Sequence, residues 1–584
     1  MSGAGQTPAP AGGAGPSRDD GRAAWGSGVL APLRHRLFLV LYLFSAASTL
    51  GSWMQNAAAG WQMTDLTSRA LLVSLVDVMT TIAMFLLVLP GGVLADLVSR
   101  RLVMIVCNVI ACASSVVLGA LSLAGFMTPD WLLMLLFVGA TTRALMNPTW
   151  QGVLPQLVKK DELGPAVTLN ALSVSITLAL GPALAGVLLS VSGAWLVYFI
   201  NAATFLGIGA ALFFWKEPVH HSDLPAERLV VAVRNGLRFV RSSPGIVAVS
   251  ARIAAFGFLA GALLSILPVY ARTALKLGPT GFGLLTACVG LGGFATGTLL
   301  LPRLLKHVPQ SLLANGGTLL LGAVLAVVGL TRSFPLACAL FFVAGGARIV
   351  MIAVYKVSAQ SVLPPWVRSR GIAVVLMASF AGFAAGGIVW GSLVDAVGVR
   401  STYLIAAATS VVVVAATGWL KIPYGITDGA NLAGEVPDYP VARIDEPEMR
   451  IGPVEARYRI KVPDALAAEA LPLLEEHTRM HRRAGALYSV LWRDLTEPDQ
   501  YVLAVGFDNW AERLRLKEHL SEADSALLRR TDELLGMDAL VVLQDFAPAR
   551  AEIHPRAPRP TSTPEQPPQA AVSAVSADQP QQAG

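Results

Sequence analysis

Charge is the scarcest property of this 584-residue sequence, because only 14% of its residues are Asp, Glu, Lys or Arg while 54% are hydrophobic. Soluble globular chains carry about 25% charged residues. The few charges are sparse before about residue 422 and dense after it. This break predicts a long membrane domain followed by a soluble one.

Several other shortages exclude whole classes of protein. The four cysteines, Cys107, Cys112, Cys288 and Cys338, lie in apolar segments and predict buried apolar residues rather than a disulfide framework. Residues 1–33 lack the basic start and short apolar core of a signal peptide and are expected to form a disordered arm. No phosphate-binding loop is present, which argues against an ATP-driven pump. No basic and aromatic patch points to nucleic acid.

What the chain does have is a series of apolar segments of about 20 residues, the length that crosses a bilayer. They fall into two groups of six and begin near Leu37, Leu71, Leu102, Trp131, Ala166 and Ala194, and near Ile246, Gly281, Ser311, Pro335, Gly371 and Thr402. The sequence therefore predicts an all-α membrane protein of 12 transmembrane helices. One six-helix bundle would cover residues 34–215, and the other would cover 246–421.

The longer polar gap at 216–245 separates the two groups. Its apolar residues recur at helical spacing with arginines between them, which predicts an amphipathic helix on the membrane surface. A plain soluble linker helix is the alternative.

Lysine and arginine are distributed unevenly between the two sets of loops. If both termini are cytoplasmic, the outer loops hold only Arg69, Arg272, Lys276, Arg332 and Arg400. Cytoplasmic loops of membrane proteins carry the excess of basic residues. We therefore expect both termini to lie in the cytoplasm.

The two groups of segments resemble each other. The fourth segment ends in "QGVLPQLV" and the tenth in "QSVLPPWV", while "GPALAGVLLSVSG" in the fifth aligns with "GGIVWGSLVDAVG" in the eleventh. Parallel repeats of six helices are a transporter architecture, with the substrate held between the halves near the midplane and alternating access to the two sides.

A charged motif follows the second segment: Gly92, Leu94, Asp96, Arg100 and Arg101. Two six-helix groups with G-x-L-a-D-x-x-x-R-R between the second and third helices resemble the major facilitator superfamily. In that family the cluster is held to latch the two halves on the cytoplasmic side. Asp96 and Arg100 would lie i,i+4 on one helix face and pair. The alternative is a cluster that only sets orientation.

Further phrases refine the resemblance. "WQMTDLTSRALLVSLV" and "NPTWQGVLPQLVKKDEL" are similar to bacterial exporters of the enterobactin-exporter and macrolide-efflux type. Gly181, Pro182 and Gly186 resemble the G-P-x-x-G-G antiporter motif, with Ala185 in place of one glycine. The resemblance covers residues 36–421 and implies a multi-pass exporter in a bacterial cytoplasmic membrane, not an enzyme. It would move a drug, siderophore or secondary metabolite, driven by the proton gradient without a cofactor.

Polar side chains interrupt two apolar segments at helical spacing. The fourth and tenth segments contain Arg143, Asn147, Gln151, Arg348, Lys356 and Gln360. Charged residues inside a membrane usually face a cavity or a partner. Because no acid matches these bases, we expect a cationic cavity that favours anionic or phenolic cargo. The alternative is that each base pairs with helix carbonyls or extends to the membrane surface.

Acids and histidines are rare in the segments, although a proton carrier needs a group of this kind. Asp77 is the only carboxylate well inside a segment, and no segment contains histidine. We therefore expect Asp77 to carry the coupled proton, with Asp96 as the alternative.

The last part of the chain reads as a separate domain. A linker at 422–450 precedes alternating strands and helices at 451–548 in the order β-α-β-β-α-β, which predicts a ferredoxin-like α+β domain. The phrases "RRAGALYSVLWRDLTEPDQYV" and "FDNWAERLRLKEHLSEAD" resemble the dimeric α/β-barrel modules of antibiotic-biosynthesis-monooxygenase type. Residues 549–584 are rich in Pro, Gln and Ala and are expected to be disordered.

Three roles for this domain stay open at the level of sequence. It would form a homodimer or sense a ligand in the cytoplasm, or it would be a monooxygenase-like enzyme tethered to the exporter. A separate alternative concerns the whole chain, which would then be a receptor-like or lipid-moving relative of transporters. His477 and His481 stand four residues apart, but no acid accompanies them at motif spacing, so no metal site is predicted.

Overall fold

A computed structural model describes residues 30–97, 99–159, 162–215, 243–363, 368–420, 452–520, 522–536 and 540–546. The expectations for the disordered arm, the linker 422–450 and the tail 549–584 fall outside the described residues, apart from a short 3-10 turn, η1, at Ala31–Arg34. The amphipathic helix expected at 216–245 also lies outside them, apart from its last three residues.

Six long helices form the N-terminal half of the membrane domain. They are α2 (Arg36–Leu66), α3 (Ala70–Leu97), α4 (Arg100–Leu123), α5 (Pro129–Leu157), α6 (Leu163–Ser192) and α7 (Ala194–Phe214). Each begins within three residues of the expected start, because the onset of the apolar run sets the helix. Local signals mark some of the boundaries: the hydroxyl of Thr128 accepts from the Trp131 amide at the start of α5, and Gly193 separates α6 from α7 at a φ of 84°.

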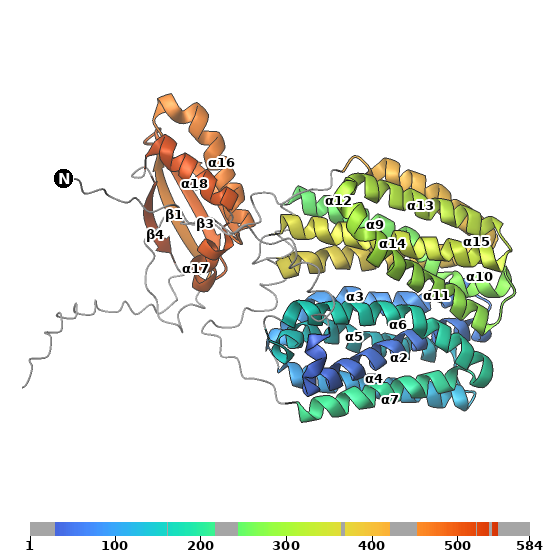
Figure 1. Ribbon diagram of the computed structural model, residues 1–584. Helices are drawn as coiled ribbons and strands as arrows, with labels where there is room; N and C mark the ends of the chain where they lie inside the picture. Colours follow the sequence, from blue (N-terminus) through green and yellow to red (C-terminus); the bar gives the residue numbers. More distant parts are fainter. Residues whose placement is uncertain are drawn as a thin grey trace, which may run out of the picture.

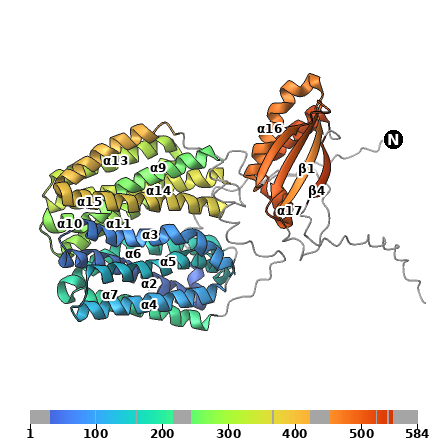
Figure 2. The same cartoon turned by 180° about the vertical axis from the view of Figure 1, so that it is seen from behind.

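The C-terminal half is built from helices of less regular length. They are α9 (Pro244–Ser265), α10 (Leu267–Thr273), α11 (Pro279–Ala295), the π-helix η3 (Thr296–Leu300), α12 (Leu301–His307), α13 (Gln310–Leu330), α14 (Phe334–Val362) and α15 (Arg368–Thr417). The backbone of α15 is non-helical at Gly398, which has a φ of 80°, so two helices meet there. Figure 1 shows the two halves side by side, and the reverse view in Figure 2 agrees.

Ten helices in the described part of the chain are long and apolar enough to cross a membrane. The 50-residue α15 counts once in this set, and α5, which carries Arg143, is not in it. Large apolar side chains cover much of the outer surface of the helices, such as Val109, Val191 and Leu206. A membrane-embedded chain has this distribution because lipid tails, unlike water, do not drive such residues inward.

The last domain has a four-stranded antiparallel sheet in the order β2-β3-β1-β4. Its elements are β1 (Val454–Lys461), the 3-10 turn η6 (Asp464–Leu466), α16 (Ala467–Arg483), β2 (Tyr488–Arg493), β3 (Gln500–Phe507), α17 (Trp510–His519), α18 (Glu522–Leu535) and β4 (Leu540–Phe546). Side chains of β1 alternate between buried and more exposed. The buried set, which includes Tyr458 and Ile460, forms a core with residues of the helices.

Candidate functional site

The helices of the membrane domain run between two opposite ends of the bundle. We call the end where α2 begins and α15 finishes the terminal end. The opposite end, where the chain turns from α2 to α3 and passes Gly398 inside α15, is the distal end. The two ends hold different sets of polar contacts, and these contacts position the candidate site residues.

At the terminal end, the two arginines of the charged motif bind main-chain oxygens within the N-terminal half. Arg100 donates from Nη1 to the Gly152 carbonyl at 2.8 Å. Arg101 donates to the carbonyls of Leu212 and Phe213 at 3.2 and 2.5 Å. The Leu212 and Phe213 carbonyls lie in the last turn of α7, where a helix leaves acceptors unsatisfied and a cation is favourable, whereas Gly152 lies five residues before the end of α5.

The charged motif is not one continuous helix, as its spacing suggested. Helix α3 ends at Leu97, and Ser99 caps α4 by accepting from the Leu102 amide at 3.3 Å. Asp96 and Arg100 therefore belong to different helices, and the i,i+4 relation on one helix face is wrong. The cause is the N-cap serine, which favours a helix start. The backbones of Gly92 and Asp96 lie in the last two turns of α3, and their side chains fall outside the described residues.

At the distal end, a carboxylate of the C-terminal half caps a helix of the N-terminal half. Asp395 accepts from the Ala70 amide at 2.6 Å and from the Leu71 amide at 3.0 Å. These are the first two residues of α3, whose N-terminal amides lack partners inside the helix. The negative charge also opposes the positive end of the helix dipole. This contact therefore joins α15 to α3 across the two halves.

A second distal contact joins the halves through an arginine. Arg272 of α10 donates from Nη1 to the Asp65 carboxylate at 2.5 Å and to the Thr64 hydroxyl at 2.7 Å. Its guanidinium also lies 5.7 Å from the ring centre of Trp61, and this ring stacks on Phe282 of α11 at 5.6 Å. The arrangement combines an exposed ion pair with a cation–π contact and an apolar one.

The predicted antiporter motif lies partly at the interface between the halves. A Cβ atom on Gly186 would lie 3.1 Å from the Gly283 Cα of α11, and one on Gly283 would lie 2.5 Å from the Pro182 oxygen. Gly181 instead faces its own half, since a Cβ there would lie 2.6 Å from the Trp53 Cβ. Small residues allow membrane helices to approach this closely. Two members of the motif thus meet α11, and the third meets α2.

The polar stripe predicted for the fourth segment is present on α5. Arg143 is half-buried and donates to the Asn56 amide oxygen of α2 at 3.5 Å. Asn147 and Gln151 follow at intervals of four residues and are exposed. Exposed polar residues inside an otherwise apolar helix are typical of a water-filled cavity.

The matching stripe on α14 contains Arg348, Lys356 and Gln360. Arg348 is half-buried, whereas Lys356 and Gln360 are exposed. Among the described residues, no carboxylate forms an ion pair with Arg348 or Lys356. The stripes thus belong to different halves, and both carry positive charge.

Asp77 lies on α3, at the interface between the halves. Its neighbours Ser74 and Val78 pack against Gly391 and Gly387 of α15. The Asp77 side chain is half-buried, and its main-chain oxygen accepts from two threonine hydroxyls of the next turn. This location would expose the carboxyl to any movement between α3 and α15.

The two histidines of the last domain are satisfied inside the protein. His477 donates to the Thr531 hydroxyl at 2.9 Å, because that hydroxyl already donates to Leu527, and His481 donates to the His477 carbonyl at 2.8 Å. Burial lowers the pKa of His477 to about 4. Burial also lowers the pKa of His481 to about 3, and the neighbouring His477 lowers it further. The described residues hold no group of three or more metal-ligating side chains.

Sequence reasoning missed the distal contacts. The sequence analysis placed Arg272 in an outer loop and assigned no role to Asp65 or Asp395. Asp395 and its partner Ala70 are separated by 325 positions, and no local pattern marks such a pair. The change from an apolar run to a lone acid at the end of a segment was the only available signal.

Comparisons with known proteins agree with this architecture. Residues 27–542 match the major facilitator family described as "Transmembrane secretion effector". The enterobactin exporter EntS of Salmonella choleraesuis is 28% identical over 311 residues, covering 52% of this chain and 71% of that protein. The staphyloferrin A transporter of Staphylococcus aureus is 24% identical over 276 residues, covering 46% and 68%.

Solved structures show the same fold at lower identity. A bacterial homologue of the human lysosomal transporter Spinster, in an inward-facing and unoccupied conformation, has a TM-score of 0.51 at 16% identity and covers 67% of this chain and 96% of its own. The nucleoside transporter NupG has a TM-score of 0.51 at 14% identity and covers 66% and 98%. These likenesses place the fold among membrane transporters.

Proposed function

The chain belongs to the transmembrane secretion effector family of the major facilitator superfamily, and on that premise we propose that it is a proton-coupled exporter of a small molecule. The family and the relatives are membrane transporters, not enzymes. The exporter would work by alternating access in a bacterial cytoplasmic membrane, with both termini in the cytoplasm. The relatives named for enterobactin and staphyloferrin A support a siderophore or similar metabolite as cargo.

The proposal includes twelve membrane spans in two bundles of six. Helix α5 has 29 residues, which is long enough to cross, and its Arg143 faces α2 inside the protein. Dividing α15 at Gly398 adds one more span. With these two changes the ten apolar helices would become twelve, divided between the proposed bundles 34–215 and 246–421.

The contacts that join the two halves at the distal end support alternating access. The distal contacts of Asp395, Arg272 and Gly283 all join one half to the other. The arginine contacts described at the terminal end join parts of the N-terminal half. A transporter closed at one end is open to the other side, and cytoplasmic termini would make this an inward-open state. An exporter loads its cargo in that state.

The cavity stripes support an anionic or phenolic cargo. Arg143, Arg348 and Lys356 present positive charge from both halves. A cationic drug would be repelled by this set, whereas a carboxylate or phenolate would be attracted. Asp77 remains the proposed proton carrier because it lies where α3 meets α15.

Reconstituted vesicles with an imposed pH gradient test the transport proposal. We expect gradient-driven movement of enterobactin or staphyloferrin A, and Asp77→Asn should abolish the dependence on the gradient. Undiminished pH-driven transport by Asp77→Asn would remove Asp77 from that role. Absence of any gradient-driven cargo movement in the wild type would overturn proton-coupled export.

The cargo charge is tested separately. Arg143→Gln and Lys356→Gln should each lower transport of an anionic cargo about tenfold, the effect of roughly 1.4 kcal/mol, and that of a neutral cargo much less. Arg332→Gln, an exposed basic residue between α13 and α14, is the matched control and should change neither. Equal losses for anionic and neutral cargo would reject the anionic preference.

For the last domain, we propose the ferredoxin-like, dimeric assignment. The sheet order β2-β3-β1-β4 with helices between the strands supports it. Tyr488 and Trp492 point to the same face of β2, and the Trp492 ring is 60% exposed. An exposed aromatic on an open sheet face suits an interface with a second copy.

The dimer is tested on the full-length protein by light scattering in detergent. Trp492→Glu should shift a dimer to a monomer, because it would bury a charge in the interface. Leu495→Glu is the control, since Leu495 is almost fully exposed beyond the end of β2. A dimer that survives Trp492→Glu would contradict this interface.

A further inference from the structure

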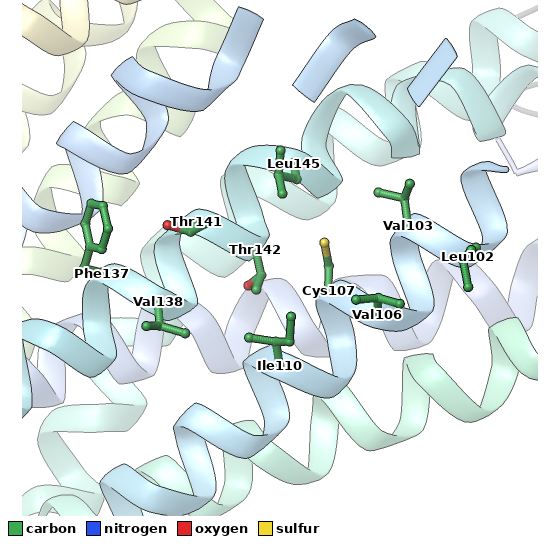
Figure 3. Close-up of a pocket in the computed structure, with 10 residues that line it drawn as sticks. All are labelled: Leu102, Val103, Val106, Cys107, Ile110, Phe137, Val138, Thr141, Thr142 and Leu145. Carbon is green, nitrogen blue, oxygen red and sulfur yellow. The ribbon is translucent and has the colours of Figure 1, made fainter. Parts of the chain in front are cut away.

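An apolar groove of about 470 Å³ lies between α4 and α5. Figure 3 shows that its walls come from both helices, with Leu102 and Ile110 on α4 and Phe137 and Leu145 on α5. The Cys107 side chain also lines it. None of the proposed gating, cavity or proton-coupling residues line this groove, so it needs a separate explanation.

The groove opens on the lipid-facing side of α4. Leu102, Val106 and Ile110 are 53%, 46% and 42% exposed, and Val109 beside them is 61% exposed. A surface that lines a water-filled cavity carries polar side chains, as Asn147 does on α5. The exposed face of α4 has none among these residues, which indicates contact with hydrocarbon.

The chemistry of the lining excludes a polar cargo. Leucine, valine, isoleucine and phenylalanine make up most of the walls. The only hydroxyl groups of the lining belong to Thr141 and Thr142, and that of Thr142 already donates to the Gly139 carbonyl of its own helix at 2.8 Å. A polar molecule would lose its hydrogen bonds with water here without gaining replacements.

The lining also argues against a second membrane helix as the occupant. Helices pack closely in membranes through Gly, Ala, Ser and Thr, as Gly186 and Gly283 do at the interface between the halves. Large branched side chains and a phenylalanine line most of this groove, which has two threonines, Thr141 and Thr142, but no glycine, alanine or serine. A hollow with such walls fits a flexible hydrocarbon chain better than a rigid helix.

The length of the groove matches one leaflet of a bilayer. Eight residues separate Leu102 from Ile110, about 12 Å along α4 at 1.5 Å per residue. Half of a hydrocarbon core about 30 Å thick is roughly 15 Å. The groove begins at Leu102, one residue after Arg101, at the terminal end of α4, where a membrane-embedded helix would meet lipid headgroups.

We propose that this groove is a binding site for one acyl chain of a membrane phospholipid. The chain enters from the leaflet at the terminal end and lies against α4 and α5 down to the level of Ile110. The site depends on membrane embedding alone and not on the direction, coupling or cargo of transport.

Native mass spectrometry of the full-length protein in detergent tests the site with palmitoyl-oleoyl phosphatidylglycerol as the probe. Val106→Trp and Ile110→Trp would fill the groove and should weaken lipid retention at least tenfold. Val109→Trp lies on the same exposed face outside the groove and should leave retention unchanged. Lipid retention equal to wild type in both groove variants would overturn the proposal.

A second measurement avoids bulky substitutions. In a chain with Cys112→Ala, Cys288→Ala and Cys338→Ala, Cys107 is the remaining cysteine and lines the groove. Added phosphatidylglycerol should slow its alkylation by a membrane-permeant maleimide about tenfold, and enterobactin should not. Protection by enterobactin but not by the phospholipid would reassign the groove to cargo and reject the lipid site.

Discussion

The two ends of the membrane domain use polar contacts in opposite ways. At the distal end, Asp395 and Arg272 reach from the C-terminal half to the N-terminal half. At the terminal end, Arg100 and Arg101 bind carbonyls of their own half. The difference shows that similar chemistry, a charge at a helix terminus, either joins the halves or stabilises one of them, depending on which chain segment supplies it.

The C-terminal half repeats the terminal-end arrangement. Arg252 of α9 is buried and donates to the Leu420 carbonyl, just after α15, at 3.0 Å, and it also bonds Asn315 of α13. Arg101 does the same for the end of α7 in the other half. Each half thus caps its last span with one of its own arginines. Four predictions test this comparison.

The largest effect is expected from the helix crossing that brings the halves together. Gly283→Leu would place side-chain atoms against the backbone of α6, since even a Cβ would lie 2.5 Å from the Pro182 oxygen. Overpacking of this kind costs about 1–3 kcal/mol, and we expect a lower thermal midpoint and loss of transport. Gly316→Leu is the control, because a Cβ there meets nothing within 4 Å. Equal losses in both variants would show that the crossing has no special role.

The next effect is expected from the helix cap. Asp395→Ala removes both acceptors from the start of α3 and should weaken distal closure by about 1–2 kcal/mol, or roughly five- to thirtyfold in population. The readout is maleimide labelling of Ser74→Cys, a buried position beside Gly391, in a chain without the native cysteines. Asp395→Asn keeps one acceptor oxygen and should give an intermediate rate. Unchanged labelling after Asp395→Ala would contradict a role in closure.

A smaller effect is expected from the exposed ion pair. Arg272→Gln removes contacts with Asp65 and Trp61, worth about 0.2–1 kcal/mol each at an exposed site. Labelling of Ser74→Cys should rise only a few fold. Because salt screens exposed charges, the difference from wild type should shrink at 1 M salt. A difference that grows with salt would point to an apolar origin instead.

The smallest effect on closure is expected from the terminal end. Arg101→Ala should leave Ser74→Cys labelling unchanged, since the hydrogen bonds described for Arg101, to Leu212 and Phe213, lie in its own half. Hydrogen exchange near the end of α7 should instead become roughly 10- to 150-fold faster, because charged hydrogen bonds are worth about 1.5–3 kcal/mol. Distal opening after Arg101→Ala would break the distinction between the two ends.

Much of the fold follows from local sequence, because apolar length and helix signals act within one segment. The starts of all six helices of the N-terminal half lie within three residues of expectation. The polar stripes are equally local, since Arg143, Asn147 and Gln151 repeat at intervals of one turn. The placement of Asp96 and Arg100 on one helix was wrong for a local reason as well, because Ser99 caps α4 and a new helix begins there.

The partners in the site could not be predicted in the same way. The antiporter motif marked Gly186, but nothing in its surroundings identified Gly283 as the residue it meets. Asp395 stands near the end of an apolar run, as many topogenic charges do, and its role depends on α3 arriving beside it. Contacts between residues hundreds of positions apart require the two bundles to be docked first.

Composition and periodicity alone establish a membrane chain of two repeated halves with basic stripes inside it, because the bilayer imposes length and polarity on every segment. Only the packing of the two halves against each other decides which end of the bundle closes. Closure depends on Gly283 allowing α11 to approach α6 and on Asp395 reaching the free amides of α3. Both are short-range interactions that exist only once the halves meet.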